Sequence, residues 1–119
     1  MLAGIFGRSV AGGGLIDIDN SGAITVATAI GNIDTDFPGV AGGIVANTNG
    51  NPSTTRINNS GTIATTGPQA QGIVAFSATN DTVDGSDIAI TNSGAISTNG
   101  DDAFAILNQS FGALANQVI

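Results

Sequence analysis

The chain has 119 residues and a formal net charge of −7, with neither Cys nor His and with only two basic residues, Arg8 and Arg56. So little positive charge leaves nothing to neutralise a phosphate backbone, which excludes nucleic acid as a partner. The lack of Cys and His excludes disulfides, the usual zinc sites and the commonest general base. Glycine is abundant, at 18 residues, while Trp, Tyr, Lys and Glu are missing, which favours short strands and tight turns over long helices.

The first 14 residues contain no targeting segment that we recognise. Residues 1–7 lack the basic start and the long apolar run of a secretory signal peptide, and no later stretch is long enough to span a bilayer. The glycine run at residues 11–14 opens onto a predicted strand, so we interpret it as a flexible turn and not as a phosphate-binding loop. We therefore expect no export signal in this chain and no membrane insertion by it.

A short phrase with the pattern Ile-x-Asn-Ser-Gly-x-Ile occurs three times, at residues 18–24, 57–63 and 90–96. Apolar and polar residues alternate beside it, as in residues 16–19 (IDID), and a period of two predicts short, half-buried strands. The Asn-Ser-Gly sequence predicts the turn between two strands. Asn and Gly both tolerate a positive φ, and Ser and Asn can bond the nearby backbone.

A second phrase, in which a small residue precedes Ile, follows each copy of the first. It covers residues 41–46, 70–75 and 103–108, and residues 2–7 form a partial fourth version. The distances between the phrases reduce to one unit of about 29 residues, with extra residues near 30–39 and 80–85. Insertions that are confined to the junctions of a repeat indicate loops on a solenoid.

One unit has room for three short strands and three turns, which predicts an all-β chain. We expect residues 1–119 to form a single parallel β-helix of three to four coils. Helical solenoids have repeats near this length but need helix formers and longer apolar runs at i, i+3, i+4 spacing, while a β-sandwich with coincidental repetition is the other alternative. In stacked coils we expect Ile63 to point inward and Ala64 outward. The three Asn residues of the phrase, Asn20, Asn59 and Asn92, are then predicted to form an amide ladder from coil to coil.

Three segments resemble the repeats of bacterial autotransporter passenger domains, which belong to the type V secretion proteins. They are AGIFGRSVAGGG (residues 3–14), INNSGTIATTGPQAQGIVAFS (57–77) and TNSGAISTNGDDAFAILNQSFG (91–112). The resemblance covers essentially the whole chain and implies a single-stranded right-handed β-helix that is exported through a C-terminal outer-membrane barrel. The signal peptide, barrel and capping segment of the family are missing, and residues 111–116 stand where the family has a glycine run. We therefore expect a piece of a longer passenger domain.

Asp17 and Asp19 form an outward pair of acids in a predicted strand, and some β-helix lyases and hydrolases use outward carboxylates on one sheet. The repeat places Asp17 beside Arg56 and then Ala89, and Asp19 beside Asn58. A salt bridge between coils explains Asp17 and Arg56 at least as naturally as an active site does. A groove that gathers the two acids and Arg56 would favour an enzyme, and a flat face would favour a structural role.

Two further acidic segments invite a calcium interpretation, because Asp oxygens around a glycine turn are ordinary calcium ligands. The acids are Asp81, Asp84 and Asp87 in residues 80–87, and Asp34 and Asp36 in residues 31–39. The first segment lacks the later bidentate acid of an EF-hand, and the chain has no glycine-rich calcium repeat. We favour solvated turns at both places. The outward Thr positions after each Asn-Ser-Gly are too irregular for an ice-binding ladder.

These observations favour a structural or adhesive β-helix segment at the cell surface or in the secreted space, with no catalytic, metal or cofactor site. The alternative is a carbohydrate-active module of the polysaccharide lyase or hydrolase type. We expect the inserted loops to contact molecules on host or neighbouring cells. Because no polar cap is evident at either end of the coil stack, we expect the isolated chain to associate end to end.

Overall fold

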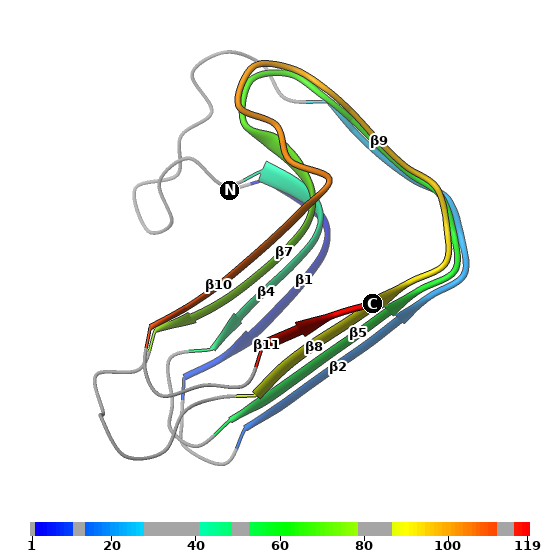
Figure 1. Ribbon diagram of the computed structural model, residues 1–119. Coiled ribbons are helices and arrows are strands. Elements are labelled where there is room, and N and C mark those ends of the chain that lie inside the picture. The colour runs from blue at the N-terminus through cyan, green and yellow to red at the C-terminus, as the bar shows by residue number, and fades with distance from the viewer. Residues whose placement is uncertain (1, 11–13, 28–40, 49–52, 79–86, 112–115) are drawn as a thin grey trace.

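The computed structural model describes residues 2–10, 14–27, 41–48, 53–78, 87–111 and 116–119, and every regular element in these ranges is a β-strand (Figure 1). The strands form three sheets, and all pairs of neighbouring strands are parallel. The chain visits the three sheets in turn and winds in a right-handed sense (Figure 1). The prediction of a parallel β-helix is therefore confirmed, with three full coils and part of a fourth.

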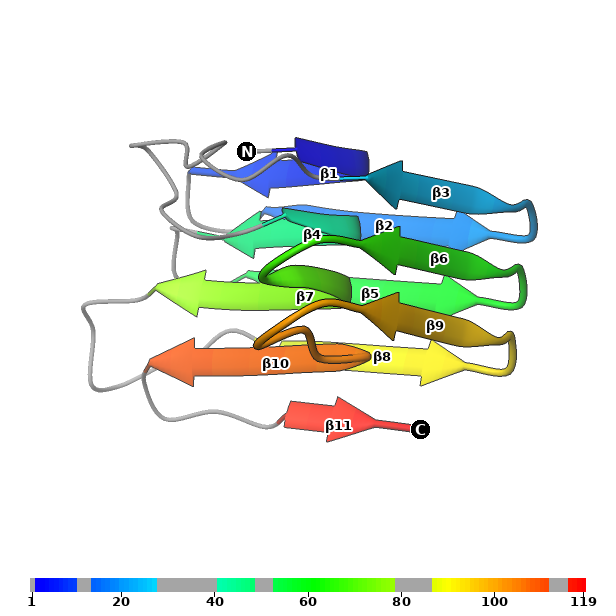
Figure 2. The ribbon, with the colours of Figure 1, turned by 90° about the horizontal axis from the view of Figure 1, so that it is seen from above.

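The first sheet contains β1 (Leu2–Ser9), β4 (Ala41–Thr48), β7 (Ala70–Ala78) and β10 (Ile106–Phe111). The second sheet contains β2 (Leu15–Asn20), β5 (Thr54–Asn59), β8 (Asp87–Asn92) and β11 (Asn116–Val118). The third sheet contains β3 (Ile24–Ala27), β6 (Ile63–Thr66) and β9 (Ile96–Asn99). Figure 2 shows the coils lying on top of one another, with β1 to β3 at one end and β10 and β11 at the other.

Strand pairing follows the register that the repeat predicts. Ile44 of β4 pairs with Ile73 of β7, which is the uninterrupted unit of 29 residues predicted from the sequence. At the Asn-Ser-Gly phrase, successive coils are offset by 39 and then by 33 residues, so the extra residues fall between strands. The two predicted insertions, near 30–39 and 80–85, lie outside the described residues.

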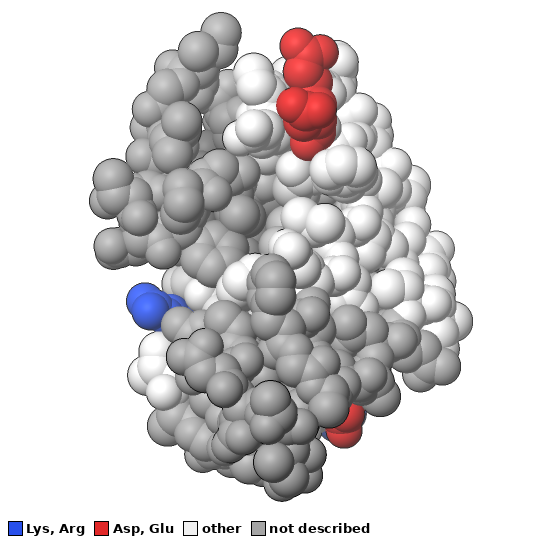
Figure 3. Space-filling view, turned by 60° about the vertical axis from the view of Figure 1, so that its left-hand side comes forward, with Lys and Arg blue, Asp and Glu red and all other residues white. Residues whose placement is uncertain are grey.

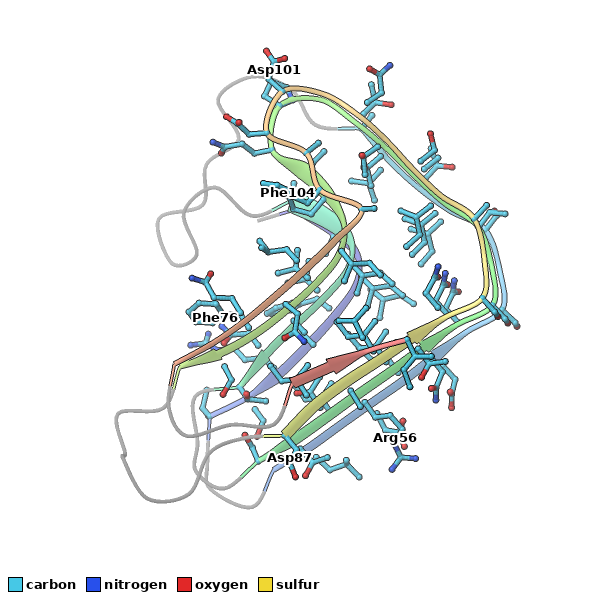
Figure 4. All side chains as sticks on the ribbon, in the orientation of Figure 1. Arg56, Phe76, Asp87, Asp101 and Phe104 are labelled. Atoms are coloured by element: carbon cyan, nitrogen blue, oxygen red, sulfur yellow. The ribbon has the colours of Figure 1, made fainter. Side chains whose placement is uncertain are left out.

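Aligned isoleucines fill the space between the sheets, as the columns of inward side chains in Figure 4 show. Ile57 and Ile90 have no exposed surface, and Ile63 is 1 % exposed. Burial alternates along β6, so Ile63 points inward and Ala64 outward as predicted. Each fully buried Ile contributes about 1.5–3 kcal/mol of apolar burial, which makes these columns the main stabilising element of the fold.

The first sheet is buried on both faces at its centre. All eight residues of β4 are buried, including Val45, which alternates with the core residues Ile44 and Ala46. Burial on both faces explains why this segment reads as a continuous apolar run and not as an alternating one. A Cβ atom on Gly43 would overlap the Cγ2 atom of Ile63, so the small residue before Ile is required by packing across the interior.

The Asn-Ser-Gly phrases form the corner between the second and third sheets. The glycines of these turns, Gly22, Gly61 and Gly94, form the predicted turns without a positive φ, because among the described glycines only Gly67 has one, at 118°. Coil spacing selects glycine instead: a Cβ on Gly61 would collide with the carbonyl oxygen of Gly22, and one on Gly94 with that of Gly61. Gly is needed here because two backbones approach closely at the corner.

Candidate functional site

The interior of the corner is held by an asparagine ladder, which we define as Asn20, Asn59 and Asn92. Asn20 Nδ2 donates to Asn59 Oδ1 at 2.7 Å, and Asn59 Nδ2 donates to Asn92 Oδ1 at the same distance. The second N–H of each amide donates to a carbonyl oxygen two residues further on, at 3.0, 3.0 and 2.8 Å. Asn59 is 2 % exposed, so a buried polar side chain is satisfied in both directions along the axis. The predicted ladder is confirmed.

A shallow groove of about 170 Å³, lined by polar residues, runs along the outer side of the same corner. We call it the corner groove, and its lining residues are Asp19, Asn20, Ser21, Asn58, Asn59, Ser60, Thr91 and Ser93. Asp19 pairs with Asn58 and Asn58 with Thr91 along the second sheet, so these three side chains form one column across three coils. The middle serine of each Asn-Ser-Gly phrase forms a second column beside it. The groove therefore presents repeating hydroxyl and amide groups along the axis.

Asp19 is the only carboxylate among the lining residues of the corner groove. Its Oδ1 accepts a hydrogen bond of 2.7 Å from Asn58 Nδ2 in the next coil. Ser60 Oγ lies 3.4 Å from the Asn20 carbonyl oxygen, which it contacts weakly. The groove can thus offer both hydrogen-bond donors and acceptors to a polar ligand. Its one negative charge, on Asp19, lies in the first coil.

The acid pair predicted from the sequence is divided between two environments. Asp17 lies outside the corner groove and forms an exposed ion pair with Arg56, with 3.6 Å between Oδ2 and Nη1. Figure 4 shows the Arg56 side chain projecting outward from the second sheet. The register prediction for Asp17, Arg56 and Asn58 is confirmed, but only Asp19 and Asn58 belong to the groove. General acid–base hydrolysis of a glycoside uses two carboxyl groups, and this groove supplies one.

The remaining predicted positions contribute little to this site. Asp87 is exposed at the start of β8, whereas Asp81 and Asp84 lie outside the described residues, as do Asp34 and Asp36. Within the described ranges, no group of three or more acidic, His or Cys residues is placed to hold a metal ion. Charged side chains are few on the face shown in Figure 3, where acidic side chains lie together at the top of the view and a basic side chain lies apart from them.

The outer face of the third sheet carries two columns of small side chains, namely Thr25, Ala64 and Ser97, and Ala27, Thr66 and Asn99. All six residues are exposed, as the strand period predicts. The face has no regular Thr ladder, as the sequence predicts, so it gives no support to an ice-binding interpretation.

In the parts of the chain that the structure describes, no helix has the length and apolar character needed to cross a membrane.

Sequence reasoning missed three groove residues, Ser21, Ser60 and Ser93. The sequence did contain a signal for these residues, because Ser occupies the middle of all three Asn-Ser-Gly phrases. We had explained this repeated Ser by the turn alone.

Comparisons with models of protein families, with curated proteins and with solved structures find no match to this chain.

Proposed function

We propose that the chain is a structural, non-catalytic β-helix segment with an adhesive role, part of a cell-surface or secreted protein of the autotransporter passenger type. The observation that carries this proposal is the use of the repeat phrase. Its Asn side chains bond from coil to coil, its Gly residues admit the neighbouring backbone, and its Ile residues fill the core. Because the repeated residues stabilise the stacking of coils, the chain is suited to act as a rigid spacer that holds other surfaces at a distance.

The corner groove is the contact surface that we propose for adhesion. Its hydroxyl and amide groups repeat from coil to coil, so they suit an extended polar ligand on a host or neighbouring cell, such as a glycan chain. The loops near 30–39 and 80–85, which lie outside the described residues, are further candidates for such contacts. Nucleic acid is an unsuitable partner for a chain of net charge −7.

Surface display tests the adhesive role. The chain is fused to an outer-membrane β-barrel carrier in a non-adherent bacterium, and attachment to epithelial cells is counted against the carrier alone. We expect several-fold more attachment with the chain, reduced when Asp19→Ala and Asn58→Ala are combined. Thr25→Ala, on the exposed outer face of the third sheet, is the matched control and should not change attachment. Attachment equal to that of the carrier alone, at equal display, contradicts the adhesive role.

A carbohydrate-active module is the second candidate, and the position of Asp19 among sugar-compatible polar groups is the observation in its favour. The test is incubation of the purified chain with acidic and neutral polysaccharides, followed by assay of reducing ends and of unsaturated products. We expect no turnover. Turnover that disappears in Asp19→Asn would establish the enzyme and refute the non-catalytic role.

A further inference from the structure

The corner groove presents a similar set of polar groups once in every coil. Its outer column holds Asp19, Asn58 and Thr91 in strand register, and the serine of each Asn-Ser-Gly phrase lies two residues further on. Parallel strands are about 4.8 Å apart, so the set repeats at that distance along the axis. Because the groove lies on the outer side of the corner, coils added before or after the described ones would lengthen it and not cover it.

The groups that a ligand can reach in this groove differ from those that hold the coils together. Both N–H groups of the Asn59 amide are used inside the corner, by Asn92 Oδ1 and by the Gly61 carbonyl. Asp19 is exposed, and its Oδ1 accepts from Asn58 Nδ2 at 2.7 Å. Its Oδ2 accepts no hydrogen bond from the described residues. One carboxylate oxygen is therefore open to a ligand beside the exposed serine column.

Charge is the strongest attraction that the corner groove offers to a ligand. Among the described residues that line it, none is aromatic and none is basic, so a sugar ring finds no stacking platform and an anion finds no partner. A hydrogen bond between neutral groups mostly replaces one to water, whereas a bond from a cationic donor to a carboxylate is roughly twice as strong. The net charge of −7 also attracts cations and repels anions. The groove therefore suits a ligand that carries positive charge.

We propose that the corner groove binds an extended glycan of protonated amino sugars, such as a polymer of glucosamine. This inference rests on the proposed adhesive use of the groove. An ammonium group of the glycan donates to Asp19 Oδ2, and its hydroxyl groups bond to the Asn58 amide and to the serine column. Glycans that carry carboxylate or sulfate groups are rejected, because Asp19 repels them and no basic side chain of the described lining offsets that repulsion.

The spacing of the coils favours a sugar chain over a basic peptide. A pyranose ring with its bridging oxygen spans a length close to the coil spacing, so successive sugars meet successive coils. An extended peptide advances about 3.3–3.6 Å per residue, so it falls out of step with groups that are about 4.8 Å apart. Its side chains also alternate in direction, which turns every second one away from the groove.

Isothermal titration calorimetry of the intact 119-residue chain with glucosamine oligomers tests the proposal, in a mildly acidic buffer that keeps the sugar amines protonated. We expect saturable binding that Asp19→Asn weakens about tenfold or more, because this change removes the charge and keeps an acceptor for Asn58. Asp101→Asn is the matched control, since Asp101 is exposed at the turn after β9, on a different corner (Figure 4). It changes the net charge equally and should bind like the parent. Thr91→Asp adds a carboxylate to the outer column and should tighten binding severalfold, which damage to the fold would not do.

Equal effects of Asp19→Asn and Asp101→Asn, equal binding of fully acetylated oligomers, or no saturable binding would each overturn the proposal. Oligolysine that binds as tightly, with the same dependence on Asp19, would also overturn it, because the groove would then be a general cation site. None of these results touches the adhesive role if bacteria that display the chain still attach to cells. Loss of that attachment at equal display contradicts the adhesive role whether or not the oligomers bind.

Discussion

At the residue scale, the Asn-Ser-Gly phrase is defined by what each residue meets in the neighbouring coil. Asn59 is hydrogen-bonded to Asn20 of the preceding coil and to Asn92 of the following coil, and Gly61 lies against the carbonyl of Gly22. Local turn preference alone would allow several residues at these places. At the spacing of parallel strands, the first position of the phrase must hydrogen-bond to the coils on both sides, and the third position has no room for a Cβ atom. Stacking therefore selects Asn at the first position and Gly at the third.

The two glycines Gly61 and Gly22 provide a matched test of this explanation. Gly61→Ala should lower the free energy of unfolding by about 1–3 kcal/mol, because the corner must open to admit the Cβ. In Gly22→Ala the nearest atom to the new Cβ is Asn20 Oδ1, at 3.8 Å, so the change should stay within about 0.5 kcal/mol. Urea unfolding followed by circular dichroism gives both values. Equal destabilisation by the two changes would contradict the explanation of Gly61 by coil spacing.

The ladder predicts a similar contrast between neighbouring asparagines. Asn59→Ala removes the partner of Asn20 Nδ2 and of Asn92 Oδ1 at a buried position and should cost about 2–4 kcal/mol. Asn58→Ala removes only the exposed hydrogen bond to Asp19 and should cost less than about 1 kcal/mol. Thermal unfolding of the two variants measures the difference. A smaller loss for Asn59→Ala than for Asn58→Ala would refute a stabilising ladder.

At the scale of the strand, alternation decides which face a residue occupies. In β6 the residues Ile63 and Thr65 are buried, while Ala64 and Thr66 are exposed. Thr65 is buried without cost because its Oγ1 donates to the Ala70 carbonyl at 2.7 Å across the next corner. β4 departs from this rule, because it is buried on both faces. A strand that is covered on both sides loses the alternating signal in its sequence.

One pair of adjacent substitutions tests the inward and outward assignment in β6. Ile63→Asp places a charge in the isoleucine core and should cost about 4 kcal/mol or more, which unfolds the chain. Ala64→Asp places the same charge on the exposed face and should leave the chain folded. Far-ultraviolet circular dichroism and sedimentation distinguish the two outcomes. Equal effects of the two substitutions would contradict the strand assignment.

At the scale of the molecule, the two ends of the coil stack differ from its middle. The described large apolar residues that are exposed all lie at the ends: Phe6, Val10 and Leu15 at the first coil, and Phe104, Val118 and Ile119 at the last. Edge strands there carry unpaired N–H and C=O groups, which favour pairing with another chain. The middle coils bury their apolar residues because each has a coil on both sides.

End-to-end association of the isolated chain follows from these edges. We expect light scattering to show a mass that rises with concentration, as β10 and β11 of one copy meet β1 and β2 of the next. Ile119 uses both its N–H and its C=O toward β8, so the N–H of Val118 faces the open edge. Val118→Pro removes that donor and should reduce the association. A parent chain that stays monomeric at high concentration would contradict this expectation.

Much of the fold could be predicted from the sequence, because the repeat carries its own register. The strands, the isoleucine columns, the asparagine ladder and the Asp17–Arg56 pairing all follow from aligning one copy of the phrase with the next. The candidate site was less predictable. Asp19 and Asn58 were assigned to one column, but their separation from Asp17 depends on where the corner hollows the surface.

By itself the sequence determined the period, the face of each residue in the alternating strands and the partners between coils, because a repeated phrase can only stack on itself in one register. The tertiary structure decided what lies between those columns. It decided that Gly61 is required by the carbonyl of another coil, that Val45 is buried on the outer face of its sheet, and that the serines join Asp19 in one groove. These features depend on distances between coils and corners, which no single copy of the phrase contains.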